Sequence, residues 1–162
     1  MTTAAAAAWI FTAFGGVRLA LTWINSGGLR QDRQLEDAAI GGRSQHPGPP
    51  EPARQEHGLS ATLVFGHGGL ALVGLAVWLA YVLPGENTAA APITALLLLL
   101  VVGLGLEMFR RWLRYGKEGG VVGPDVQETP ADAHLSPALV YMHGLAAAVT
   151  VALVIAAAVK IA

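Results

Sequence analysis

The chain has no cysteine, which excludes disulfide bonds, iron–sulfur clusters and thiolate metal sites from its 162 residues. Charged residues are also scarce, at 13% of the total, and the sequence has no run of basic residues that would bind nucleic acid. We therefore expect no nucleic-acid partner. The sequence also lacks a phosphate-binding loop, a dinucleotide fingerprint and a zinc motif, so it gives no reason to expect an enzyme.

Apolar residues are what the chain has in excess. They make up 54% of the sequence, and the mean hydropathy is +0.52. They gather in four blocks, each close to the length of about 20 residues that crosses a bilayer as a helix. The blocks span 4–24, 59–83, 93–112 and 136–159. We predict a single all-α membrane domain, a transmembrane four-helix bundle whose surroundings are a lipid bilayer.

Lysine and arginine indicate how the bundle is oriented. They concentrate in segment 25–57 and around the end of the third block and segment 113–133, whereas the short turn 84–92 has none. Basic residues stay on the cytoplasmic side of a membrane. We therefore expect both longer segments inside the cell and both termini outside, in a multi-pass protein of the inner (cytoplasmic) membrane.

The two longer segments have too few apolar residues to build cores of their own. Segment 25–57 is rich in Gly, Pro and Gln, with a short surface helix expected around 29–40. Segment 113–133 has the same loop-like composition. Neither segment is predicted to be a catalytic domain.

A phrase of ten residues occurs twice in the chain. Leu-Ser-x-x-Leu-Val-x-x-His-Gly stands at 59–68 and again at 135–144. It begins the second and the fourth blocks, which run through the membrane in the same direction. The duplication predicts a two-plus-two parallel repeat of helices.

The duplicated phrase places two histidines at one depth. His67 and His143 each follow a serine by seven residues, which is about 10 Å of helix rise. Counting back seven residues from Asn25 reaches Arg18 at the same depth. Ionisable side chains among hydrocarbon are costly and usually functional. Glycines of all four blocks share this layer: Gly15, Gly16, Gly66, Gly68, Gly69, Gly103, Gly105 and Gly144.

This layer has the composition of a site for a flat, anionic cofactor. Haem b takes two neutral imidazoles as axial ligands, and a buried arginine can neutralise its propionates. We predict His67 and His143 as the metal ligands and Arg18 as the cofactor-binding partner of one haem b. Such a protein would carry electrons to a quinone or to a partner subunit.

Other interpretations stay open. Glycine in membrane helices often serves close helix packing, and a lone histidine can hydrogen-bond a neighbouring helix. The chain would then be a non-catalytic accessory or assembly subunit of a larger membrane complex, or a homo-oligomer. A third possibility is a small proton relay or transporter, because imidazole changes its charge near neutral pH.

The remaining polar residues receive simpler interpretations. Glu107 is expected to pair with arginines one turn away on its own helix. His57 and His134 are expected at solvated helix ends. Met142 is expected in core packing rather than in a copper site.

Two resemblances rest on the histidine motifs. Gly66-His67-Gly68-Gly69-Leu70-Ala71 and Tyr141-Met142-His143-Gly144-Leu145-Ala146-Ala147 resemble segments of uncharacterised small bacterial four-helix integral membrane proteins. That resemblance covers the second to fourth helices and implies the same four-span topology without an activity. One histidine on each of two parallel helices is similar to cytochrome b561-like membrane haem proteins. The chain departs from their two-haem members, so the similarity implies at most one haem.

Overall fold

The computed structural model describes residues 2–41, 58–82, 90–116 and 130–159, and these residues contain helices and no strand. The helices are α1 (Thr2–Asn25), α2 (Gly28–Gly41), α3 (Ala61–Val82), α4 (Ala90–Arg111) and α5 (Pro137–Val159). A π-helical turn, Trp112–Gly116, continues α4, and a 3₁₀ turn, Ala131–His134, precedes α5.

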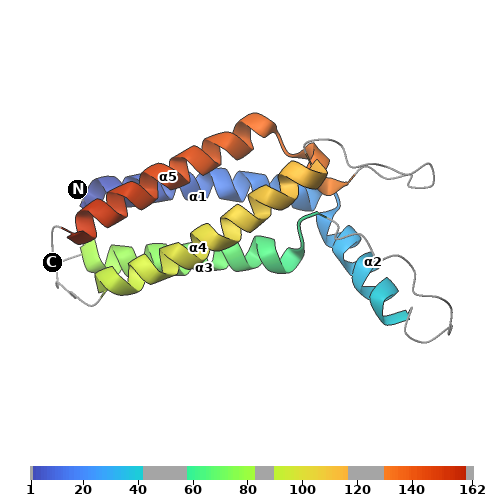
Figure 1. The fold of residues 1–162 in the computed structure, drawn as a ribbon, viewed down its shortest axis with the longest axis horizontal. Helices are drawn as coiled ribbons and strands as arrows, with labels where there is room; N and C mark the ends of the chain where they lie inside the picture. The colour runs from blue at the N-terminus through green and yellow to red at the C-terminus, as the bar shows by residue number, and fades with distance from the viewer. Residues whose placement is uncertain (1, 42–57, 83–89, 117–129, 160–162) are drawn as a thin grey trace.

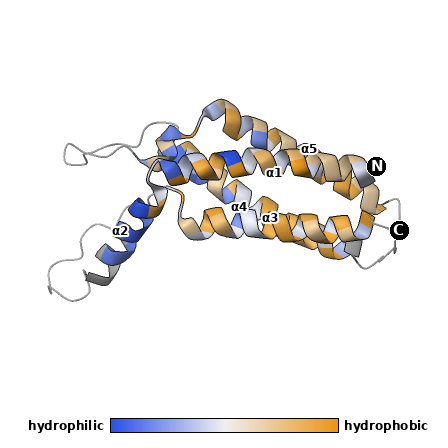
Figure 2. Ribbon diagram, turned by 180° about the vertical axis from the view of Figure 1, so that it is seen from behind, coloured by the Kyte–Doolittle hydropathy of each residue, from blue (hydrophilic) through white to orange (hydrophobic). Residues whose placement is uncertain are grey.

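Four of the helices are long and apolar enough to cross a membrane, which confirms the predicted all-α transmembrane bundle. They are α1, α3, Pro92–Arg114 and α5. Hydrophobic residues run along their whole length in Figure 2, whereas α2 is largely hydrophilic. The surface helix expected around 29–40 is α2.

The long helices pack as two pairs. α1 lies along α5 and α3 lies along α4, while contacts of α1 with α3 and of α4 with α5 join the pairs. The backbones of the diagonal helices, α1 with α4 and α3 with α5, do not approach each other closely. Figure 1 places the start of α1 and the end of α5 at one end of the bundle, here called the terminus end. α2 projects from the opposite end, here called the α2 end.

Local sequence explains where several helices begin. The Ser60 hydroxyl accepts a hydrogen bond from the Leu63 N–H at 3.4 Å and so caps α3. Pro137 is the first residue of α5, where its missing N–H removes no helical hydrogen bond. The turn from α1 to α2 uses Gly27 at a φ of 93°, a conformation that side chains other than glycine rarely adopt.

The predicted two-plus-two repeat extends further in the structure than in the sequence. α5 repeats α3 with His143 standing 76 positions after His67. α4 repeats α1 with a spacing of 89 positions, which matches Trp23 to Trp112, each 2% exposed. Both tryptophans belong to one buried cluster, so matched positions of α1 and α4 lie at the same depth.

The core consists of two separate clusters. The cluster at the terminus end contains Ala5, Ala6, Trp9, Trp78, Leu98, Val154 and Ala157. The cluster at the α2 end contains Trp23, Val64, Trp112, Ala131 and Leu135. On every long helix, the layer of glycines and histidines falls between the two clusters. The middle of the bundle therefore contains two imidazoles and several glycines, and neither buried cluster extends into it.

Candidate functional site: a pair of facing histidines

His67 and His143 come together in the middle layer. Their ring centres are 6.2 Å apart, and the ring planes make an angle of 74°. The two residues lie on α3 and α5, diagonal helices that have no backbone contact. The imidazoles are thus the groups that bridge the bundle at this depth, and the prediction that they share one layer is confirmed.

Each imidazole is fixed by a hydrogen bond to a neighbouring helix. The Nδ1–H of His67 donates to the Val101 carbonyl on α4 at 3.0 Å, and that of His143 donates to the Thr12 carbonyl on α1 at 3.1 Å. A carbonyl oxygen can only accept, so the proton of each neutral ring is on Nδ1. Nε2 of each ring therefore keeps a free lone pair.

Glycines on the neighbouring helices make room for both rings. A Cβ on Gly105 of α4 would lie 3.0 Å from His67 Cε1, and a Cβ on Gly16 of α1 would lie 3.1 Å from His143 Cε1. Each glycine stands four residues after the carbonyl that binds the same ring. Both imidazoles are therefore held by the same carbonyl and glycine arrangement, once from each half of the repeat.

The other glycines of the layer have a different surrounding. A Cβ would meet no atom within 4 Å at Gly66, Gly68, Gly69, Gly103 or Gly144. Close packing between helix backbones is therefore not what these five glycines provide. The glycines that do contact another helix in this layer contact an imidazole.

Arg18 is not brought to the histidines. Its side chain is exposed, on the same face of α1 as Phe14 and Leu21, so the expectation of an arginine buried beside the imidazoles is wrong. The reason is helix rotation. Gly16 faces His143, and two further residues turn the chain by about 200°, which directs Arg18 outward.

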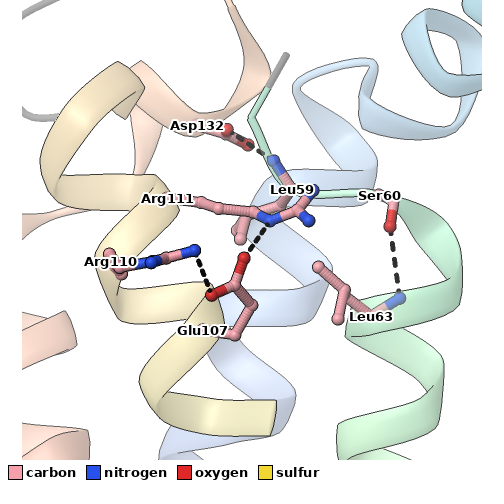
Figure 3. A network of polar contacts seen from close by, with 7 residues as sticks. All are labelled: Leu59, Ser60, Leu63, Glu107, Arg110, Arg111 and Asp132. Carbon is pink, nitrogen blue, oxygen red and sulfur yellow. Dashed lines mark hydrogen bonds and ion pairs between the residues drawn. The ribbon is translucent and has the colours of Figure 1, made fainter. Parts of the chain in front are cut away.

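The predicted ion pair of Glu107 is confirmed. Its carboxylate binds Arg110 at 2.9 Å and Arg111 at 2.8 Å on the same helix (Figure 3). The prediction that Met142 packs in the core is wrong, because its side chain is 59% exposed. Met142 comes one position before His143. His134 is exposed, as expected for a helix end, and His57 lies outside the described residues.

Asp132 is a buried carboxylate that the sequence did not single out. It is 3% exposed and accepts the Trp23 Nε1–H at 2.9 Å. It also accepts the Leu59 N–H at 2.8 Å (Figure 3). It thereby ties α1, the start of α3 and the turn before α5 together at the α2 end. When the alignment of the duplicated phrase is extended toward the N-terminus, Asp132 matches Glu56, which lies outside the described residues. This repeated acidic position is the signal in the sequence that could have indicated a role for Asp132.

Asp132 should make stability depend on pH. Burial raises the pKa of its carboxyl above the usual range, against the opposing effect of the Leu59 and Trp23 hydrogen bonds. The folded chain then keeps this proton to higher pH than the unfolded chain. Its contribution to stability is complete below the ordinary Asp pKa and is lost as pH rises through the folded pKa.

This pH dependence can be measured with Asp132→Asn. We expect the free energy of unfolding of the wild type, minus that of the variant, to fall as pH rises through this window and to be flat elsewhere. Chemical unfolding in detergent micelles at a series of pH values measures it. Subtracting the variant removes the contributions of other titrating groups. A difference that rises with pH would contradict the assignment.

Comparison of the chain with family models, with curated proteins and with solved structures gave no match. The interpretation of the histidine pair therefore rests on its geometry.

Proposed function

We propose that this chain is a small membrane cytochrome that holds one haem b between His67 and His143 and carries electrons within the membrane. The observation that carries the proposal is the spacing of the two rings, 6.2 Å between centres. Two metal–nitrogen bonds of about 2 Å, plus about 1 Å from each nitrogen to its ring centre, require about 6 Å. A direct hydrogen bond between the rings would instead require about 5 Å.

The donor set supports the same proposal. Both rings have Nδ1–H bound to a carbonyl, which fixes ring orientation and leaves Nε2 as the ligand atom, as is usual for metal-binding histidines. The described residues contain no group of three or more side chains suited to a bare metal ion. Two imidazoles are what haem needs, because its own ring supplies the other four nitrogens.

The alternative of histidines as packing elements accounts for the two carbonyl hydrogen bonds. It also accommodates the spacing, because edge-to-face ring pairs have centres about 4.5–7 Å apart. It gives no role to the two Nε2 atoms, which accept no hydrogen bond from any described residue. The haem proposal accounts for the hydrogen bonds, for the spacing and for both Nε2 atoms. For this reason we prefer it to an accessory subunit or a proton relay.

Bound haem would supply one-electron oxidation and reduction. The protein's own part is to hold and orient the two imidazoles through Val101 and Thr12, and to separate them from both membrane surfaces by the two apolar clusters. We place the chain in the inner membrane, with a quinone or a partner subunit as electron acceptor. Arg18 has no place in this site, because its side chain lies on the outer face of α1.

An absorption spectrum tests the proposal. The chain is expressed with ample haem supply, purified in detergent and measured oxidised and reduced. We expect about one haem per chain and a Soret band with the sharp reduced bands of a six-coordinate bis-imidazole centre. A colourless protein that also fails to take up added haem would refute the proposal.

Gly105→Ala should weaken haem binding through His67. The new methyl group would lie 3.0 Å from Cε1 and push the ring off the Val101 carbonyl. Loss of a ligand's orienting partner typically lowers metal affinity by about 10- to 100-fold. Titration of haem into the haem-free protein measures the effect.

Gly103→Ala is the matched control, because it lies on the same helix and its Cβ would meet no atom within 4 Å. It should bind haem like the wild type. Equal haem affinity of the two alanine variants would show that the space that Gly105 leaves for the His67 ring has no role in haem binding.

A further inference from the structure

We propose that copies of this chain associate side by side in the membrane, with the outer face of α1 of one copy against the outer face of α4 of the next. This inference does not depend on haem. It starts from Arg18, an exposed charged residue on a membrane-spanning helix. The Arg18 side chain makes no hydrogen bond or ion pair with any described residue. Such charges usually face a partner.

Lipid headgroups are a poor partner for Arg18. The nearer membrane surface is at the α2 end, since Asn25 ends the helix seven residues later, about 10 Å away. Helical side chains lean toward the N-terminus of their own helix, which for α1 is the terminus end. Arg18 is therefore directed away from the nearer headgroups, and a carboxylate at its own depth is the better partner.

The chain carries one such carboxylate. Within the four membrane-spanning helices the acidic residue is Glu107 on α4. It stands 89 positions after Arg18, the spacing of the α1 and α4 repeat, so the two charges lie at the same depth. Each is rotated by about 200° from the glycine that faces an imidazole, Gly16 or Gly105, and so points outward.

The shapes of the two helix faces also match at the spacing of 89 positions. Phe14 on α1 is 72% exposed, and its repeat position on α4 is Gly103, which is exposed and has no neighbour within 4 Å of its Cβ position. Because α1 and α4 are diagonal, the face of α1 with Phe14 and the face of α4 with Gly103 lie on opposite sides of the bundle. In a second copy with the same membrane orientation, Phe14 would meet the notch at Gly103 while Arg18 meets Glu107.

Glu107 can take part although it already binds Arg110 and Arg111. Its side chain remains 31% exposed, and each carboxylate oxygen accepts one of the two contacts. A carboxylate has about four lone-pair positions, so about two remain for an arginine from another copy. Arg110, 63% exposed, is also free to turn to the membrane surface.

The absence of cysteine makes a cross-linking test direct. Phe14→Cys and Gly103→Cys chains with different tags are produced together in one membrane and oxidised. We expect a mixed cross-linked dimer, and little or none from either variant alone. Gly69→Cys replaces Gly103→Cys as the control, because Gly69 is exposed on α3 at the matching depth. No mixed dimer, or equal cross-linking by Phe14→Cys alone or by the control pair, would overturn the proposal.

The charge pair is tested in the same system. Arg18→Glu on the Phe14→Cys chain should lower the yield of mixed dimer by about tenfold, because two carboxylates would then face each other. Glu107→Arg on the Gly103→Cys chain should restore it. A yield that Arg18→Glu leaves unchanged would overturn the pairing of Arg18 with Glu107.

Discussion

His67→Ala and His143→Ala are each expected to abolish the bis-imidazole spectrum of the haem-loaded protein. Each substitution removes one of the two imidazoles that the proposed haem needs as ligands, and their ring centres lie 6.2 Å apart. Among the described residues, no further His, Cys, Asp or Glu groups with the pair to replace the lost imidazole. The measurement is the reduced-minus-oxidised spectrum together with the haem content per chain.

The two variants should remain folded, because each loses one hydrogen bond of about 1 kcal/mol. His134→Ala is the control, since His134 is exposed and lies outside the membrane-spanning helices. It should keep the complete spectrum. If His67→Ala and His143→Ala both kept a six-coordinate spectrum, the iron would have to be bound elsewhere.

Gly58→Ala is expected to lower the free energy of unfolding by at least about 3 kcal/mol. Gly58 has a φ of 36°, where a side chain costs about 1–2 kcal/mol, and its Cβ would overlap Asp132 Oδ2. Displacing that carboxylate also leaves the buried N–H of Trp23 and the part-buried N–H of Leu59 without their acceptor, at about 1–3 kcal/mol each. Unfolding by a denaturing detergent measures the change.

Gly69→Ala is the comparison for this experiment. It lies inside α3, and a Cβ there meets no atom within 4 Å. Alanine favours a helix over glycine by about 1 kcal/mol, so this variant should be as stable as the wild type or slightly more so. Two variants of similar stability would mean that Asp132 does not hold the α2 end closed.

The bundle and the shared depth of the histidines could be predicted because both depend on local pattern. Apolar blocks of sufficient length identify the helices, and the duplicated phrase sets His67 and His143 in one layer. The repeat of α1 in α4 could not be found in this way, because few residues are identical between them. Matched burial, as at Trp23 and Trp112, makes it visible in the structure.

Arg18 was misplaced because counting residues gives depth and no direction around the helix. The rotation from Gly16, which faces an imidazole, was needed to direct Arg18 outward. Asp132 was missed for another reason. Its partners Trp23 and Leu59 are 109 and 73 residues away in the chain, so the composition of its own segment says nothing about them.

The position of Asp132 late in the chain also determines the order of assembly. During synthesis the Trp23 and Leu59 donors enter the membrane long before their acceptor has been made. The same late stretch of chain delivers the second imidazole, on α5. Until the ribosome completes that stretch, the nascent chain can neither lock its α2 end nor bring the two imidazoles together, so maturation must wait for the last helix.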